Sequence, residues 1–237
     1  IGLSNKMLAK KADRVCVAYP LPAYKEENLD NLIYTGNPIR EDIYTGNRDR
    51  GRKEFNLSDK QPVLLVTGGS QGAYIINMLV SDALEKLLEN YQVIHVSGER
   101  DYDWLSYRTQ KLEESLKDNY HLHNYLSENL RDALAVADLV ISRAGNNFIA
   151  ELAALAKPTI LIPLSTSAND HQLTNAKILS QSGAALLMLQ EHLRPKKLIR
   201  QIDLLFDRPE ELKQMSEHIH EFAREEAAKL VASEIIK

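Results

Sequence analysis

The sequence predicts an α/β fold built on a Rossmann-like, doubly wound parallel sheet. From residue 63 onward, short runs rich in Leu and β-branched residues alternate with helical patterns. These runs are apolar throughout, which is typical of parallel strands whose two faces are both covered by helices. In addition, a glycine-rich turn separates the first of these runs from an amphipathic helical pattern. Together, the three observations favour parallel strands joined by helical crossovers.

The main sheet is expected to fill the chain from residue 61 to residue 237. Its strands are predicted at 63–67, 92–96, 121–124, 139–142, 159–163 and 185–189. Apolar residues at i, i+3 and i+4 from Ile75 to Leu87 predict the first helix of this domain. Two long, charged, amphipathic helices are expected at its end, at 195–206 and 210–235.

The first 60 residues have a different pattern. A basic helix is expected at 6–15, and short strands are expected at 15–19 and 31–35. Residues 46–60 contain Gly, Asn, Asp and five basic side chains, a composition that favours a linker. The predicted organisation is therefore a remnant of a preceding domain with its connection at 1–45, a linker at 46–60, and the main domain at 61–237.

Composition narrows the functional classes. The net charge of −4 over 237 residues gives no overall attraction to nucleic acid. Cys16 is the single cysteine, which excludes an internal disulfide and is consistent with a cytoplasmic location. No apolar run approaches the ~20 residues that a membrane-spanning helix needs. The opening Ile-Gly-Leu-Ser is unlike a signal peptide and is expected to be an incomplete N-terminus.

The turn Gly68-Gly69-Ser70-Gln71-Gly72 is the first candidate site. It follows a predicted strand and precedes a predicted helix, where small residues let backbone N–H groups approach an anion. This placement predicts a site for the phosphates of a nucleotide-type ligand. A tight turn without a ligand is the structural alternative.

Two other functions are associated with turns of this kind. Gly68-x-Ser70-x-Gly72 also satisfies the nucleophile elbow of an α/β-hydrolase, which would need an acid and a base such as Asp138 and His171. A dinucleotide fold is disfavoured, because Ser70 replaces the second glycine and the next strand ends at Ser97-Gly98 without an acid.

A second cluster, residues 143–151, follows the strand expected at 139–142. Gly145 suits the turn, Asn146 or Asn147 suits a helix N-cap, and Glu151 would lie about one turn into the helix. Both this turn and the glycine turn would border one crevice, since the carboxyl ends of parallel strands share an edge. A carboxylate in that crevice could accept hydrogen bonds from two ribose hydroxyls.

A third cluster, residues 165–175, is rich in hydroxyl and amide side chains and also follows a strand. Gln172 and Asn175 would share a helix face, and such groups orient neutral sugars by hydrogen bonding. His171 alone is as well explained as a surface imidazole. Paired His or Cys spacings and acidic clusters are absent from the sequence, so no metal site is predicted.

Taken in order, the motifs Gly-Gly-Ser-Gln-Gly, Ser-Arg-Ala-Gly…Glu and Lys-Pro…Ile-Pro…His-Gln…Asn-Ala closely resemble the MurG family. Segments 2–6 and 36–40 also resemble the residues that precede the donor domain of that family. The resemblance implies the C-terminal half of a GT-B glycosyltransferase, with residues 1–45 as the end of an acceptor domain. It also implies inverting, metal-independent transfer of N-acetylglucosamine from UDP-GlcNAc to lipid I, which forms the peptidoglycan precursor lipid II, without a cofactor.

The resemblance also implies which residues contact UDP-GlcNAc. They are Arg40, Gly69, Ser70, Gln71, Gly72, Tyr125, Leu126, Gly145, Asn146, Glu151, His171, Gln172 and Asn175. Ser70, neighbouring amides and Arg40 would hold the diphosphate, and Glu151 would bind the ribose. The backbone at 125–126 would face the uracil, and the side chains at 171–175 would contact the sugar.

Two differences from the family matter. Phe148 stands where many members have a Thr, so a hydroxyl beside the diphosphate would be absent. The family's general base, acceptor loops and membrane-binding patch lie in the preceding domain, so no catalytic residue is expected in this chain. Lipid I and the inner face of the cytoplasmic membrane would be reached through that domain. A split enzyme, with this chain as a separate donor subunit, is the alternative.

Overall fold

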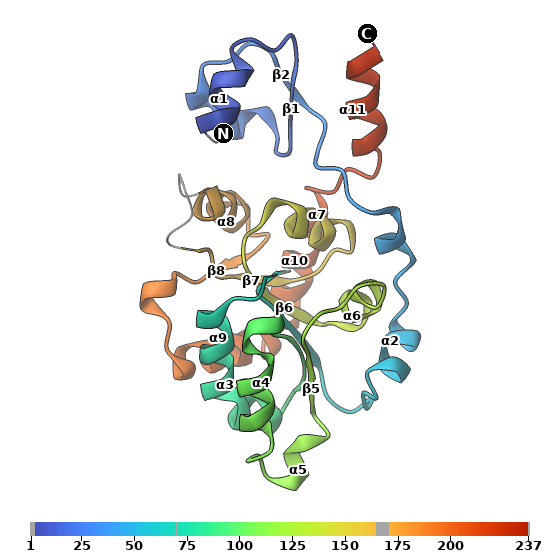
Figure 1. The fold of residues 1–237 in the computed structure, drawn as a ribbon, viewed down its shortest axis with the longest axis vertical. Helices are drawn as coiled ribbons and strands as arrows, with labels where there is room; N and C mark the ends of the chain where they lie inside the picture. Colours follow the sequence, from blue (N-terminus) through green and yellow to red (C-terminus); the bar gives the residue numbers. More distant parts are fainter. Residues whose placement is uncertain (1–2, 70, 165–170, 237) are drawn as a thin grey trace.

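A parallel sheet of six strands, in the order β5-β4-β3-β6-β7-β8, forms the centre of the molecule (Figure 1). The computed structural model describes residues 3–69, 71–164 and 171–236. The strands are β3 (Val63–Thr67), β4 (Gln92–Val96), β5 (Tyr120–His123), β6 (Leu139–Ser142), β7 (Thr159–Leu161) and β8 (Leu186–Leu187). Every strand pair is parallel, which confirms the predicted fold class.

The helices of this domain cover both faces of the sheet. They are α3 (Tyr74–Leu88), α4 (Glu99–Thr109), α5 (Glu114–Lys117), α6 (Leu130–Val136), α7 (Asn146–Ala154), α8 (His171–Gln181), α9 (Pro195–Phe206) and α10 (Pro209–His220). Leu64 and Val66 of β3 pack into one core cluster with α3 and α9. Val63 and Leu65 pack into the other with α6, α7 and α8. Alternate side chains of a strand thus serve opposite faces, which is why its residues are all apolar.

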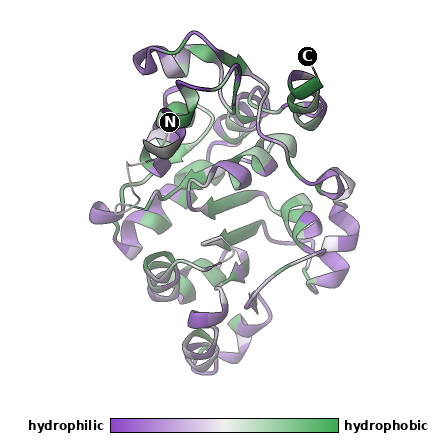
Figure 2. Ribbon diagram, turned by 45° about the horizontal axis from the view of Figure 1, so that its top comes forward, coloured by the Kyte–Doolittle hydropathy of each residue, from purple (hydrophilic) through white to green (hydrophobic). Residues whose placement is uncertain are grey.

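Hydropathy follows the same layers. Figure 2 shows hydrophobic residues concentrated on the strands of the sheet, while the surrounding helices carry hydrophilic stretches. All residues of β3, β4, β6 and β7 are buried. Within the described ranges, no helix is both long and apolar enough to cross a membrane.

A smaller unit precedes the sheet domain. It contains α1 (Leu3–Ala9) and two parallel strands, β1 (Val15–Val17) and β2 (Leu32–Tyr34), near the strands expected from the sequence. The helix expected at 6–15 is therefore shorter and begins earlier. Helix α11 (Ala227–Ile236) rises beside this unit, far from α10 (Figure 1).

The single helix expected at 210–235 is therefore wrong. Its residues form α10 and α11, separated by a bend at 221–226. Phe222 packs edge-on against Tyr19 with ring centroids 6.2 Å apart, and the guanidinium of Arg224 lies 4.4 Å from the ring centroid of Tyr34. These contacts with the N-terminal unit outweigh the local helix propensity of the segment.

Within the linker expected at 46–60, the structure contains helix α2 (Arg48–Glu54), which the sequence analysis did not predict. Asn47 caps this helix by accepting a hydrogen bond from the backbone N–H of Arg50. Arg50 also donates two hydrogen bonds of 2.6 Å to the buried carboxylate of Asp132 on α6. A Cβ at Gly51 would lie 2.6 Å from the carbonyl oxygen of Asp132, so the two helices are in close contact. The polar composition thus reflects a helix docked by charge rather than a free connection.

Candidate functional site

The order in which the chain adds strands to the sheet switches sides between β3 and β6. The chain runs from β3 to β4 and β5 on one side, then returns to β6 on the other side of β3. Thr67 at the end of β3 pairs with Ser142 at the end of β6. The two connections leave neighbouring strand ends toward opposite faces, which is the position where open α/β sheets bind ligands. The glycine turn and the Gly145 turn therefore lie side by side, as the sequence predicts.

The glycine turn is shaped by close backbone contacts. Gly69 and Gly72 have φ of 85° and 74°, and the Gly72 N–H donates to the Gly69 carbonyl at 3.0 Å. A Cβ on Gly72 would lie 2.3 Å from the carbonyl oxygen of Ser97, so only glycine fits at this position. Gln71 is exposed, while Ser70 lies outside the described residues.

Helix α3 starts directly after this turn, and α7 starts after the neighbouring one. Their N-cap residues are Ala73 and Gly145, neither of which has a side chain that could accept a hydrogen bond. The sequence-based expectation of an asparagine N-cap is wrong, because α7 begins at Asn146. The Asn147 Oδ1 instead accepts a hydrogen bond of 3.0 Å from Asn37. Two helix N-termini without a side-chain cap, side by side, form a site suited to an anion such as a diphosphate.

Glu151 is half-buried in α7, beyond the first turn of the helix. Burial raises the pKa of its carboxyl group, the positive charge of Arg40 opposes that rise, and Asp42 adds to it. The exposed Arg40 side chain lies 3.7 Å from a carboxylate oxygen of Asp42. A cation from the segment before the sheet domain thus faces the same carboxylate that the sequence assigns to a ribose.

The third cluster is joined to the crevice through α8. The side-chain oxygen of Gln172 accepts a hydrogen bond of 2.9 Å from the backbone N–H of Leu164, after β7. The side-chain nitrogen of Asn175 donates to the carbonyl oxygen of Ala144, beside the α7 N-terminus, at 3.1 Å. His171 is half-buried at the start of the helix, and residues 165–170 lie outside the described ranges. Gln172 and Asn175 therefore lie beside the turns that follow β7 and β6.

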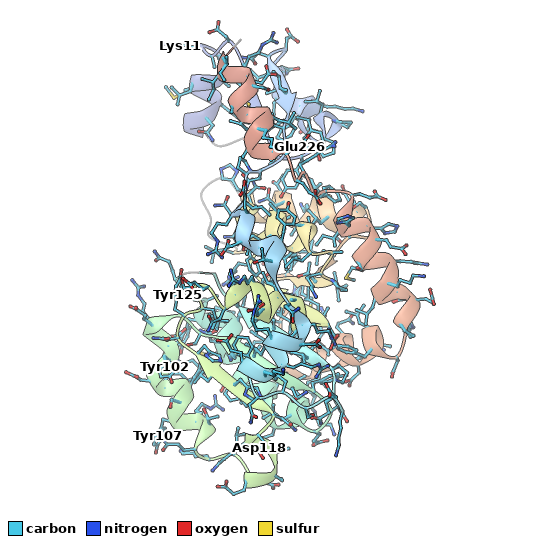
Figure 3. All side chains as sticks on the ribbon, turned by 90° about the vertical axis from the view of Figure 1, so that its right-hand side faces the viewer. Lys11, Tyr102, Tyr107, Asp118, Tyr125 and Glu226 are labelled. Atoms are coloured by element: carbon cyan, nitrogen blue, oxygen red, sulfur yellow. The ribbon has the colours of Figure 1, made fainter. Side chains whose placement is uncertain are left out.

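The turn after β5 carries the residues expected to face a uracil. Tyr125 is exposed, and Figure 3 shows it on the same side of the molecule as Tyr102 and Tyr107 of α4. Its backbone N–H donates to the side-chain oxygen of Asn124 at 2.8 Å. Leu126 is only 6% exposed and packs in the core, so it can offer a ligand only its backbone.

The position of Asp138 argues against the α/β-hydrolase alternative. Asp138 lies at the start of β6, where its carboxylate accepts a hydrogen bond of 2.8 Å from the Val63 N–H at the start of β3. It also pairs with Arg48 at 2.8 Å. Asp138 is therefore at the amino edge of the sheet, opposite the end of β3 that leads into the glycine turn, where it cannot serve as the acid for a nucleophile in that turn.

Sequence reasoning missed two supporting groups beneath the crevice. Arg143, only 8% exposed, donates to the carbonyl oxygens of Ile162 and Pro163 and so joins the turns after β6 and β7. Asn77 and His95 are fully buried and hydrogen-bonded to each other behind the glycine turn. For Asn77 and His95, the available sequence signal was a single polar residue inside an otherwise apolar run.

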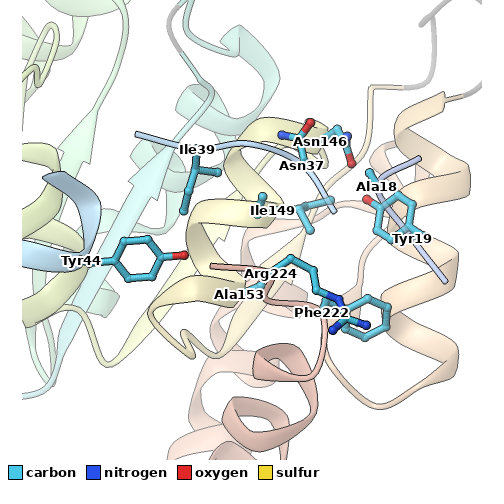
Figure 4. A pocket seen from close by; sticks show the side chains of 11 residues that line it. Ala18, Tyr19, Asn37, Ile39, Tyr44, Asn146, Ile149, Ala153, Phe222 and Arg224 are labelled. Carbon is cyan, nitrogen blue, oxygen red and sulfur yellow. The ribbon is translucent and has the colours of Figure 1, made fainter. Parts of the chain in front are cut away.

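A small pocket lies between α7 and residues that precede the sheet domain (Figure 4). Ile149 and Ala153 of α7 form one wall, facing Ile39 and Tyr44. Of the predicted donor-binding residues that the structure describes, Asn146 alone lines this pocket. Within the described part of the chain, no group of three or more His, Cys, Asp or Glu side chains is placed to hold a metal ion.

Comparison with known proteins places these features in a family context. The profile of the glycosyltransferase family 28 C-terminal domain matches residues 63–231. A UDP-N-acetylglucosamine–N-acetylmuramyl-(pentapeptide) pyrophosphoryl-undecaprenol N-acetylglucosamine transferase from Clostridium perfringens is 42% identical over 205 residues, covering 85% of this chain and 54% of the relative. A Clostridium botulinum protein of the same name is 38% identical over 207 residues, covering 87% and 56%. The chain thus spans just over half the length of these relatives.

Solved structures show the same fold. MurG from Acinetobacter baumannii superposes with a TM-score of 0.74 at 24% identity, covering 98% of this chain and 63% of that one. A UDP-N-acetylglucosamine 2-epimerase gives a TM-score of 0.65 at 16% identity, covering 99% and 60%. At these identities the likeness concerns the fold alone, and it confirms the expected C-terminal half of a GT-B glycosyltransferase.

Proposed function

The chain belongs to glycosyltransferase family 28, and we propose that it is the donor-binding half of an enzyme that transfers N-acetylglucosamine from UDP-GlcNAc to lipid I. The observation that carries this proposal is the pairing of β3 with β6. Because β3 and β6 end side by side, the pairing supports a shared site for the glycine turn and the N-terminus of α7, with Glu151 on the same helix. Such an arrangement would suit a ligand with a diphosphate at one end and a ribose beside it.

In the proposed reaction, the acceptor hydroxyl attacks C1 of the sugar with inversion while UDP departs. Charge then develops on the diphosphate. The N-termini of α3 and α7 direct backbone N–H groups and helix dipoles toward that charge and lower the barrier. Arg40, which lies near Glu151, would add a cation on the same side. The group that deprotonates the acceptor is proposed to lie outside this chain.

Glu151 is proposed to accept hydrogen bonds from the two ribose hydroxyls. Its partial burial strengthens such bonds, because few water molecules compete in that position. Gln172 and Asn175 are proposed to contact the sugar from α8, with His171 beside them. Their hydrogen bonds to Leu164 and Ala144 fix them at the crevice before a donor arrives.

The acceptor half of the proposal comes from the relatives. Their name specifies a muramyl-pentapeptide linked through pyrophosphate to undecaprenol, which is a membrane lipid. We propose that this chain acts on the same acceptor in peptidoglycan synthesis, through a further domain. On that proposal, the protein acts at the cytoplasmic face of the membrane as a peripheral protein.

Calorimetric titration of UDP into the chain, without added Mg²⁺, tests the donor site. Binding is expected, and a folded protein that binds no UDP would overturn the proposal. Glu151→Ala should weaken UDP by about tenfold, the loss of charge-assisted hydrogen bonds, while inorganic diphosphate is little affected. Glu85→Ala, an exposed position toward the far end of α3, is the matched control. An equal loss for UDP and diphosphate would remove Glu151 from the ribose.

A further inference from the structure

A chain of buried polar groups supports the glycine turn from behind. The side-chain nitrogen of Asn77 donates to the carbonyl oxygen of Ser97 at 2.8 Å and to a carboxylate oxygen of Asp101 at 2.7 Å. The other oxygen of Asp101 accepts from the indole N–H of Trp104 at 3.0 Å. The backbone N–H of Asn77 donates to the Ala73 carbonyl at 2.9 Å and closes the first turn of α3. One residue thus links the start of α3 to the end of β4.

The direction of these hydrogen bonds is determined by Asn77. Because its NH₂ group faces two acceptors, its oxygen must accept, and the Nε2 of His95, 3.0 Å away, must carry a proton. The Nδ1 of His95 is then an acceptor, and the hydroxyl of Tyr120, 2.8 Å away, donates to it. Burial lowers the pKa of His95 to about 3, which keeps the imidazole neutral. These hydrogen bonds therefore have a single direction: Tyr120 donates to His95, and His95 donates to Asn77.

The end of β4 is in turn the support of the glycine turn. A Cβ on Gly72 would meet the Ser97 carbonyl oxygen at 2.3 Å, and a Cβ on Gly98 would meet the Gly72 Cα at 2.6 Å. The two backbones are therefore in direct contact. Any shift of the Ser97 carbonyl moves the surface on which Gly72 rests, and Asn77 is the side chain that fixes that carbonyl.

We propose that Asn77 is a positioning residue which, with His95 and Tyr120 behind it, sets the glycine turn and the first turn of α3 for the diphosphate of the donor. This inference rests on the proposed donor-binding function. Its specific content is that the network acts on the diphosphate and not on the nucleoside, because its hydrogen bonds reach Ala73 and Ser97 beside the β3–α3 turn and, among the described residues, none of them goes to Glu151 or α7.

The test compares UDP with uridine by calorimetry or by competition. The ratio of their affinities isolates the contribution of the diphosphate, which a uniform loss of stability leaves unchanged in folded protein. Asn77→Leu should lower this ratio by about tenfold, because amides held even slightly out of place lose much of an anion's binding energy. The matched control is Tyr91→Phe, which removes a partly buried hydrogen bond outside the network, from the Tyr91 hydroxyl to the Asp203 carboxylate. It should leave the ratio unchanged.

A milder variant keeps the inference testable if Asn77→Leu does not fold. Tyr120→Phe removes the donor to His95 Nδ1 and leaves the contacts of Asn77 with Ser97 and Asp101 in place. Nitrogen-15 NMR should show a neutral, Nε2-protonated His95 in both the unaltered chain and Tyr120→Phe, because the Asn77 oxygen still accepts the Nε2 proton. The affinity ratio should fall by about twofold to threefold, since one hydrogen bond at a distance is lost.

Three results decide the outcome. A chain that binds no UDP refutes the proposed function itself. If the chain binds UDP but the ratio stays within twofold in a folded Asn77→Leu or is unchanged in Tyr120→Phe, the donor site stands and the positioning role is refuted. A lower ratio in both variants, with Tyr91→Phe unchanged, supports the positioning role.

Discussion

The two turns that border the crevice are built in different ways. The β3–α3 turn is held by backbone against backbone, with Gly72 and Gly98 in direct contact. The β6–α7 turn is open at Gly145, where a Cβ would meet nothing within 4 Å, and Gly145 has an ordinary φ of −72°. Long side chains hold it instead: Arg143 reaches the carbonyls after β7, and Asn175 reaches Ala144.

This difference shows that glycines in similar motifs can be present for different physical reasons. Glycine at 72 satisfies a steric and conformational requirement that no other residue meets. Glycine at 145 leaves space above the α7 N-terminus that a ligand could fill. Substitutions should therefore affect the two turns by different mechanisms.

The largest difference is expected between two alanine substitutions. Gly72→Ala places a Cβ against the Ser97 carbonyl at a positive φ, so the free energy of unfolding should fall by about 3 kcal/mol. Gly145→Ala, the matched control, should change it by less than about 0.5 kcal/mol. Urea unfolding measures both. Equal losses would mean that the two turns are built alike.

Arg143→Met tests the side-chain support of the second turn. Two carbonyl oxygens after β7 would lose their buried donor, so the free energy of unfolding should fall by about 2 kcal/mol. Urea unfolding compares this variant with Arg208→Met, which removes only an exposed pair with Glu211. A loss no larger than that of Arg208→Met would show that the turn does not depend on Arg143.

Acid should weaken the support of the first turn, because His95 lies behind that turn and not behind the second. The pKa of His95 falls from 6.5 to about 3 in the folded chain, so the unfolded chain binds the proton more readily. The stabilisation from neutral His95 is complete above its unfolded pKa and is lost as the pH falls toward 3. The free energy of unfolding should drop by about 2 kcal/mol between pH 7.5 and pH 5 from His95 alone.

Urea unfolding across this pH range gives that slope. His121, whose pKa burial lowers to about 4, adds to it in the same direction. His95→Gln should therefore reduce the slope without abolishing it. A slope that is unchanged in His95→Gln would contradict the assignment.

Local patterns were sufficient for the strands and for one helix. The predicted bounds of β3, β4, β6 and α9 match the structure, because each pattern is continuous and is ended by Gly, Pro or polar residues. The order of the motifs also placed the two turns at strand ends. The binding roles of Glu151, Gln172 and the other predicted residues remain predictions that the titrations test.

Contacts between distant residues accounted for the errors. Asp138 is close in sequence to the second turn, yet the strand β6 carries it to the opposite edge of the sheet. The 46–60 segment has the composition of a linker, but Arg50 joins it to Asp132 on α6. The bend at 221–226 depends on Tyr19 and Tyr34, which lie far earlier in the chain.

By itself, the sequence determined the α/β class and the turns after β3 and β6, because strand periodicity and turn chemistry are encoded within a few neighbouring residues. The tertiary structure decided which turns meet, which glycine is sterically required and what supports each turn. Those properties depend on the order of strands in the sheet and on partners such as Ser97 for Asn77. No local pattern contains that pairing, since it arises only when distant segments pack against each other.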